Sequence, residues 1–310
     1  MKKHYILLTT LLASSISLVG CGPTPIDPTD PNLPTVFCPV GSTLLGISKY
    51  AKQYPNQVEI GNATLIAPAL LNTQFDVIVA PITAGVNVYS KAPNYKLYNT
   101  FVWGNFYLLS NTKINSISDL QGSTISAFQK GNVPEIVLET VLKQNDIDCT
   151  VNYLSNVEAT ATAFLGGTAD IVVSAEPSVQ QILSKKPNTF VLDLQAEYKK
   201  VTNNADLPQA GIFVSNEYMN KVSDYSKYLD LLKDSVLSVN SDPKEAAESA
   251  MTLTDTFSNL GAEKLAAAVP GCNFGIKSKQ ENINAINAFL TASNDILATE
   301  YTLPDEAFYL

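Results

Sequence analysis

The sequence predicts an α/β fold made of two lobes. Short apolar strands rich in β-branched residues alternate with helical patterns along most of the chain, as is typical of α/β proteins. This alternation runs through two similar units, the second inserted into the first, and ends in a largely helical stretch. The chain has 310 residues, 45% of them hydrophobic, which is enough to bury one or two cores. We therefore expect two doubly wound α/β lobes joined by a hinge, with the C-terminal helices on the first lobe.

The N-terminus has the layout of an export signal. Lys2 and Lys3 precede an apolar stretch over residues 5–19, which is too short to span a bilayer comfortably. The stretch ends in LVGC at residues 18–21, which resembles the bacterial lipobox, whose cysteine is diacylated and becomes the new N-terminus. We expect a lipoprotein signal peptide over residues 1–20 and a stable two-chain lipid anchor at Cys21. A plain cleaved signal and an uncleaved anchor are the alternatives.

Residues 21–34 are predicted to form a proline-rich tether. Five prolines occur between Gly22 and Thr35, and no apolar periodicity is present. A segment of this composition stays extended and solvated. The folded body is therefore expected to begin near Val36.

The first lobe is predicted over residues 35–110 and 210–310. Its strands are apolar runs, expected at 35–39, 57–60, 75–81, within the aromatic stretch 95–110, and at 210–214. Its helices follow the 3.6-residue pattern and are expected at 42–53, 82–89, 217–220, 226–239, 243–259, 262–267 and 279–298.

The second lobe is predicted over residues 111–209. Its strands are expected at 123–127, 149–153, 169–174 and 190–193. Its helices are expected at 131–145, at 157–165 and in a segment ending at Leu183. The chain is expected to cross between the lobes near residues 109–111 and again near residues 208–210.

The expected mature chain contains neither histidine nor arginine, and this excludes several kinds of site. The only histidine is His4, inside the predicted signal, so histidine-based triads and most zinc sites are excluded from the mature chain. All twenty basic residues are lysines, so bidentate arginine clamps on carboxylate, sulfonate or phosphate are excluded. We expect no metal and no cofactor.

The net charge of the chain and the spacing of its cysteines argue against two further properties, nucleic-acid binding and a CxxC-type metal site. The formal charge of −9 becomes −11 once Lys2 and Lys3 leave with the signal, and an acidic chain argues against nucleic acid as a partner. Cys38, Cys149 and Cys272 are more than a hundred residues apart, which fits no CxxC-type metal motif. Each is interpreted as a small buried hydrophobic residue, and Cys38 with Cys272 is the one disulfide pairing to test.

Five segments carry a family resemblance: the lipobox, DVIVAP at 76–81, SISDLQGSTISAFQKGNVPEIVLETVLKQNDID at 116–148, AFLGGTADIVVSAEP at 163–177 and LPDEAFYL at 303–310. They resemble the solute-binding lipoproteins of ABC transporters with the type 2 periplasmic-binding fold. Within that group the chain is most similar to the branch of thiamine-precursor and aliphatic-sulfonate binders. The resemblance covers essentially the whole body.

The resemblance implies a bilobal, non-enzymatic protein that captures a small molecule between its lobes and passes it to an ABC permease and ATPase. It also implies a monomer held by its lipid anchor on the extracellular or periplasmic face of the cell membrane. The chain has no GxxxxGK[ST] phosphate loop, so ATP hydrolysis must lie on a partner chain. Two alternatives remain: a surface sensor with the same fold, and an enzyme of thiamine-pyrimidine metabolism.

The candidate site is the set of loops that follow the strands, because open α/β sheets bind ligands beyond the carboxyl ends of their strands. Glycine, hydroxyl and amide groups at helix N-termini suit polar ligand atoms. The candidates from strand ends are Gly41, Ser42, Pro81, Thr83, Gly131, Asn132 and Glu176. Each can equally serve only to cap a helix.

Trp103 and Asn105 complete the predicted site. They lie in the aromatic segment WGNFY at 103–107, near the first predicted crossing. An indole plate suits a flat heteroaromatic solute, and Asn105 or Glu176 could pair with its ring nitrogens. The alternative is that Phe101, Trp103 and Tyr107 simply belong to the core.

Overall fold

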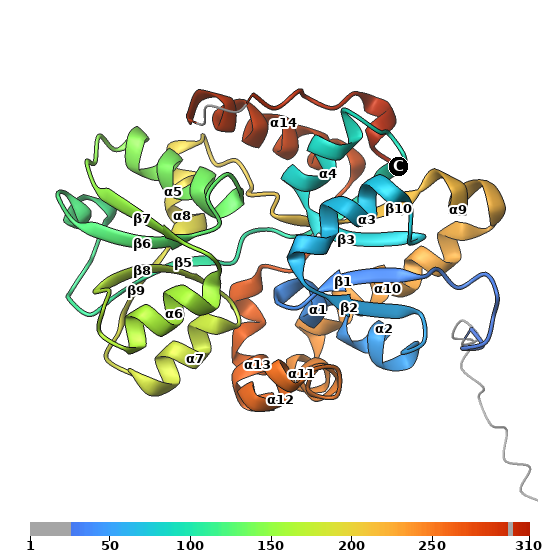
Figure 1. Ribbon diagram of the computed structural model, residues 1–310, viewed down its shortest axis with the longest axis horizontal. Helices are drawn as coiled ribbons and strands as arrows, with labels where there is room; N and C mark the ends of the chain where they lie inside the picture. The colour runs from blue at the N-terminus through green and yellow to red at the C-terminus, as the bar shows by residue number, and fades with distance from the viewer. Residues whose placement is uncertain (1–25, 297–299) are drawn as a thin grey trace, which may run out of the picture.

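The computed structural model describes residues 26–296 and 300–310, and these form two lobes that lie side by side (Figure 1). Each lobe is built around a five-stranded mixed sheet. The predicted signal peptide and Cys21 lie outside the described residues. Within the described part of the chain, no helix combines the length and the apolar character that crossing a membrane requires.

The first lobe contains a sheet with the strand order β2-β1-β3-β10-β4. The central strands are almost wholly buried because helices cover both faces, so their sequences are continuous apolar runs and do not alternate. The return strand β10 runs antiparallel to both β3 and β4. The strands are β1 (Val36–Pro39), β2 (Val58–Gly61), β3 (Val77–Pro81), β4 (Tyr95–Val102) and β10 (Ala210–Ser215).

The helices of the first lobe follow its strands and cover the sheet. They are α1 (Ser42–Gly46), α2 (Ser48–Gln53), α3 (Ile66–Asn72), α4 (Ile82–Tyr89), α9 (Asn216–Lys221) and α10 (Tyr225–Ser241).

The second lobe repeats the pattern with the strand order β7-β6-β8-β5-β9. Its strands are β5 (Phe106–Ser110), β6 (Thr124–Phe128), β7 (Thr150–Leu154), β8 (Ile171–Ala175) and β9 (Phe190–Asp193). Its helices are α5 (Val133–Gln144), α6 (Val157–Leu165), α7 (Ser178–Lys185) and α8 (Leu194–Val201).

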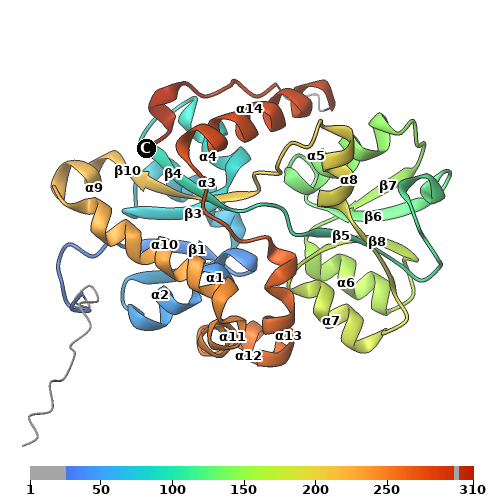
Figure 2. The ribbon, with the colours of Figure 1, turned by 180° about the vertical axis from the view of Figure 1, so that it is seen from behind.

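The C-terminal helices pack on the first lobe and also reach the second. They are α11 (Pro243–Met251), α12 (Asp255–Leu260), α13 (Ala262–Ala268) and α14 (Lys279–Ile296). Helix α13 contacts α7, and α14 contacts α5. In both views α14 lies along one edge of the molecule and extends from α4 towards α5 (Figures 1 and 2). The C-terminal helices thus lie on the first lobe, as predicted, and two of them also contact the second lobe.

A single apolar cluster joins the two lobes through α14. Phe289 and Leu290 of α14 are fully buried in the same cluster as Phe213 of β10 and Val137 of α5. Phe289 also lies near Tyr198 of α8, with ring centroids 6.4 Å apart. The helix thus connects the cores of both lobes.

Most predicted elements occur, but two predicted helices are broken and two helices were not predicted. The helices at 82–89 and 157–165 and the strand at 190–193 have the predicted bounds, whereas α3 and α8 were not predicted. The helix expected over 243–259 is broken, because the Thr254 side chain accepts a hydrogen bond from the N–H of Phe257 and so starts α12. The helix expected over 42–53 is interrupted at Ile47.

The first crossing lies earlier than predicted. The aromatic stretch 95–110 is divided at residues 103–105, and β5 on the far side pairs with β8 and β9 of the second sheet. Gly104 has φ 90°, a conformation that favours glycine. The crossing therefore falls at residues 103–105, not near 109–111, and the predicted lobe boundary after residue 110 places β5 in the wrong lobe. The return crossing occupies residues 202–209, between α8 and β10.

The described part of the predicted tether is folded against the first lobe. Leu33 is only 4% exposed, and the hydroxyl of Tyr228 donates to the carboxylate of Asp30 at 2.9 Å. The hydroxyl of Tyr218 donates to the carbonyl of Asn32 at 2.7 Å. The ordered body therefore begins before Val36, because buried tyrosine hydroxyls require acceptors and this segment supplies them.

Candidate functional site

Asn105 links the two lobes directly. It is 2% exposed, and its side-chain amide donates to the hydroxyl of Ser42 at 2.9 Å and to the carbonyl of Glu176 at 3.0 Å. Its own carbonyl accepts from the N–H of Glu176 at 3.0 Å. Ser42 begins α1 of the first lobe, and Glu176 follows β8 of the second. Three sequence-predicted residues from distant segments therefore meet at one point.

Glu176 is a buried carboxyl group without a counter-charge. Its side chain is 5% exposed, and Oε1 accepts from the amide of Gln180 at 2.7 Å. No lysine forms a salt bridge with it among the described residues. Burial raises the pKa of Glu176 to about 7, because removing water penalises the ionised form, and the hydrogen bonds from Gln180 oppose this rise.

A further segment that meets Glu176 is the 3₁₀ turn η3 (Pro270–Cys272), which follows α13. The hydroxyl of Tyr107 donates to the carbonyl of Gly271 at 3.0 Å. A Cβ at Gly271 would lie 2.9 Å from Oε1 of Glu176 and equally close to the hydroxyl of Tyr107, so glycine allows the lobes to approach here. We call Ser42, Asn105, Tyr107, Glu176 and Gly271 the interlobe site.

Two acceptor atoms at the interlobe site have no hydrogen-bond partner. These are Oδ1 of Asn105 and Oε2 of Glu176, both buried and unpaired among the described residues. Buried polar atoms are almost always hydrogen-bonded, since leaving one unpaired costs about 1–3 kcal/mol. The site therefore has two acceptors that a ligand donating hydrogen bonds would satisfy.

Cys272 lies beside this carboxyl group. Its thiol is fully buried, and burial, with Glu176 nearby, raises the pKa of the thiol well above its usual value. Cys38 is equally buried in the same core cluster, and both thiols are free in the structure. The structure therefore contains no Cys38–Cys272 disulfide, and both residues are small buried hydrophobic groups, as interpreted from the sequence.

The predicted site residues Gly41, Pro81 and Thr83 of the first lobe lie at or near the starts of α1 and α4. Gly41 has φ 138°, and its carbonyl accepts the N–H of Leu45 in the first turn of α1. Pro81 ends β3 opposite Ala210 of the return strand. Thr83, in the first turn of α4, is 1% exposed, and its hydroxyl has no partner within the described ranges. Thr83 is therefore a further unpaired polar group on this lobe.

Gly131 and Asn132 lie at the start of α5, as predicted. Gly131 has φ 81°, and its N–H donates to the carboxylate of Glu135. Asn132 is the N-cap residue, but its side chain makes no capping hydrogen bond. No hydrogen bond between described residues joins either of them to Asn105 or Glu176, so their contribution to the same site stays a prediction.

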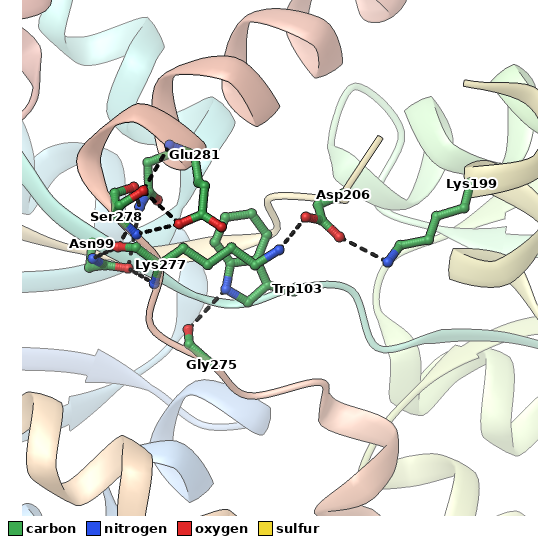
Figure 3. A network of polar contacts seen from close by, with 9 residues as sticks. Asn99, Trp103, Lys199, Asp206, Gly275, Lys277, Ser278 and Glu281 are labelled. Atoms are coloured by element: carbon green, nitrogen blue, oxygen red, sulfur yellow. Dashed lines mark hydrogen bonds and ion pairs between the residues drawn. The ribbon is translucent and has the colours of Figure 1, made fainter. Parts of the chain in front are cut away.

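Trp103 lies in the crossing, where part of its ring is already occupied. It is 7% exposed, and its indole N–H donates to the carbonyl of Gly275 at 2.9 Å. The ammonium of Lys277 lies 4.1 Å from the centre of the ring (Figure 3). The polar edge and one face of the ring are thus engaged by the protein, and only the remaining surface could serve as a plate for a solute. Phe101 is fully buried in the core.

The remaining members of this region lacked a clear sequence signal. Gly271 and Cys272 come from a short turn between helices, and Tyr107 was one aromatic residue among several. Gln180, in the first turn of α7, donates to the carboxyl of Glu176, which precedes the helix, so the helical i,i+4 rule gives no sequence signal for this pair. In the described part of the chain, no group of three or more His, Cys, Asp or Glu side chains could hold a metal ion.

Two open hollows lie away from the interlobe site. One of about 480 Å³ is lined mainly by the end of α5 and the loop before β7, and one of about 320 Å³ lies between α5, α8 and α14. Neither contains a residue of the interlobe site, and both are open to solvent. Unlike the interlobe site, they have no buried polar atom without a partner in their walls.

Comparison with known proteins agrees with this architecture. Residues 95–246 match the family model described as NMT1/THI5 like. The predicted resemblance to the thiamine-precursor and sulfonate-binding branch of solute-binding proteins is therefore confirmed. A separate comparison with curated proteins found no match.

Solved structures with the same fold cover nearly the whole chain. An ABC transporter protein from Parabacteroides distasonis has a TM-score of 0.74 at 20% identity, over 89% of this chain and 97% of that one. The periplasmic aliphatic sulphonate binding protein SsuA from Escherichia coli has a TM-score of 0.64 at 16% identity, over 84% of each chain. The alkanesulfonate-binding protein SsuA from Xanthomonas axonopodis pv. citri, bound to MOPS, has a TM-score of 0.62 at 17% identity, over 89% and 96%. The chain thus has the predicted bilobal periplasmic-binding fold.

Proposed function

We propose that this chain is the solute-binding component of an ABC importer and captures a small molecule between its lobes. The observation that carries the proposal is the pair of buried acceptors without partners, Oδ1 of Asn105 and Oε2 of Glu176. They lie where the two lobes meet, which is where hinged binding proteins close around their ligands. The proteins of similar fold described as ABC transporter and sulfonate-binding proteins support the same role.

The chemistry of the interlobe site favours a solute that donates hydrogen bonds. In its ionised form Glu176, which has no cation beside it, repels an anion such as a sulfonate, and the chain contains no arginine to hold one. An amino-substituted heteroaromatic ring would supply donors to both acceptors. We therefore propose a solute of the thiamine-precursor type, although the named binding proteins of similar fold bind sulfonates.

The proposal includes a lipid anchor at Cys21 and partners in the membrane. Anchoring on the extracellular or periplasmic face would keep the protein near an ABC permease and ATPase. The monomeric state also belongs to this proposal. A surface sensor would share the binding step, so the two roles are separated by whether the loaded protein stimulates an ABC ATPase.

A thermal-melt screen of the chain from residue 22 tests the binding step. The panel contains pyrimidine precursors of thiamine, thiamine, riboflavin, taurine and other sulfonates, nitrate and amino acids. A ligand at a hundred times its dissociation constant stabilises the protein by about 2.7 kcal/mol, which raises Tm by about 5–10 °C for a protein of this size. We expect a shift with an amino-heterocycle and none with a sulfonate. A shift with sulfonates alone would contradict the proposed solute class.

A further inference from the structure

Lys277 contacts both segments by which the chain crosses between the lobes. Its ammonium lies 4.1 Å from the centre of the Trp103 ring in the outgoing crossing, and it forms an ion pair with Oδ2 of Asp206 in the return crossing. The other carboxylate oxygen of Asp206 accepts from Lys199, on α8 of the second lobe, at 2.8 Å. Figure 3 shows Lys277 reaching past Trp103 to Asp206, with Lys199 on the far side.

The backbone of Lys277 is fixed to the first lobe. The side-chain amide of Asn99, on β4, donates to the carbonyl of Lys277 at 2.7 Å. The N–H of Lys277 donates back to the amide oxygen of Asn99 at 3.3 Å, and Asn282 of α14 also donates to the Lys277 carbonyl. A continuous polar path therefore runs from β4 through Lys277 and Asp206 to α8.

Lys277 is the residue that connects the first-lobe part of this path to Asp206. Burial raises the pKa of Asp206, but the hydrogen bonds and charges of Lys199 and Lys277 outweigh it and hold the pKa below its usual value. Without Lys277, Asp206 would remain paired with Lys199 and would follow the second lobe. The connection of the return crossing to β4 through this path would then be lost, while the pairing of β10 with β4 would remain.

We propose that Lys277 is a positioning residue that sets the angle between the two lobes. Its ammonium holds the outgoing and return crossings together, and rotation of α8 away from β4 has to stretch the Lys277–Asp206–Lys199 path. The proposal concerns the chain without solute and does not depend on which solute binds. It makes the ionic strength of the medium a determinant of lobe closure, because Lys277 and Asp206 are both partly exposed and salt screens such pairs.

A distance measurement between the lobes tests this role. Spin labels are attached at Lys52→Cys on α2 and Ser184→Cys on α7, two exposed positions in different lobes, in a Cys149→Ser background. Pulsed electron paramagnetic resonance then compares the unliganded protein with its Lys277→Met variant. Methionine keeps the length and apolar stem of lysine and removes the charge. We expect a longer and broader interlobe distance distribution in the variant.

Lys49→Met is the matched control. Lys49 is similarly half-buried and pairs with Glu245 at 2.7 Å, but both residues belong to the body of the first lobe. We expect this variant to keep the wild-type distance distribution. We also expect 1 M salt to lengthen the distance in the wild type and to leave Lys277→Met unchanged. Identical distributions for wild type and Lys277→Met, with both proteins folded by circular dichroism, would overturn the proposal and leave the solute-binding proposal intact.

Discussion

The buried carboxyl group of Glu176 makes the stability of the protein depend on pH in a defined direction. Burial raises its pKa from 4.5 to about 7. Below pH 4.5 the carboxyl is protonated in both the folded and the unfolded chain, so burial of the charge costs nothing. As the pH rises from 4.5 to about 7, the unfolded chain binds fewer protons than the folded chain, and the free energy of unfolding falls. Above about pH 7 the carboxyl is ionised in both the folded and the unfolded chain, and it lowers the free energy of unfolding no further.

The size of this effect follows from the two pKa values. At 1.36 kcal/mol per pKa unit, ionisation of Glu176 lowers the free energy of unfolding by about 3 kcal/mol at high pH. About 2.5 kcal/mol of that loss falls between pH 5 and pH 8. Glu176→Gln keeps the shape and an acceptor for Gln180 but cannot ionise. The variant should therefore gain stability relative to the wild type as the pH rises.

Urea unfolding of both proteins at pH 5, 6, 7 and 8 measures this difference. All other titrating groups are shared, so their effects cancel when the wild-type value is subtracted from that of Glu176→Gln. We expect the difference to increase by about 2.5 kcal/mol from pH 5 to pH 8. A difference that stays constant over this range would refute the reasoning, because Glu176 would then have an ordinary pKa and would not be buried as a charge.

Three further predictions concern the contacts between the lobes and within the core. Gly271→Val should displace the carboxyl of Glu176 and weaken solute binding at least about tenfold while circular dichroism stays native, because even a Cβ lies 2.9 Å from Oε1; unchanged affinity in titration calorimetry would contradict this. Phe289→Ala should lower the free energy of unfolding in urea by about 3–5 kcal/mol, because the ring is fully buried. The control Leu237→Ala should cost under about 0.5 kcal/mol, since that side chain is 44% exposed, and equal losses would argue against an α14 core. A thiol-alkylating reagent should modify Cys38 and Cys272 in the denatured protein without prior reduction, because both thiols are free. Mass spectrometry would detect the added mass, and unmodified cysteines would indicate a disulfide.

The sequence could predict the two sheets and most of their elements because these depend on local patterns. The strands predicted over 75–81 and 169–174 and the helix predicted over 157–165 follow from local hydrophobic patterns. Glu176 and Ser42 were also predictable, because the ends of strands are where α/β folds place polar ligand contacts. The fold class and the placement of part of the candidate site therefore follow from short-range information.

The contacts between the lobes could not be predicted in the same way. Gly104 and Asn105 are a local turn signal, but the pairing of β5 with a strand more than sixty residues later, which assigns it to the second lobe, has no local signal. The packing of Lys277 on Trp103 joins residues more than 170 positions apart. The indole was expected to face a solute, and only the fold shows that a lysine covers one of its faces.

The most direct test of the account is a calorimetric titration of the solute identified in the thermal screen. The titration compares the wild type with Asn105→Leu and Glu176→Met, each of which removes one unpaired acceptor and keeps similar volume. We predict that each variant binds at least about tenfold more weakly, because a buried donor on the solute loses its partner at a cost of about 1–3 kcal/mol. Wild-type affinity in both variants would contradict the account, since the solute would then bind elsewhere.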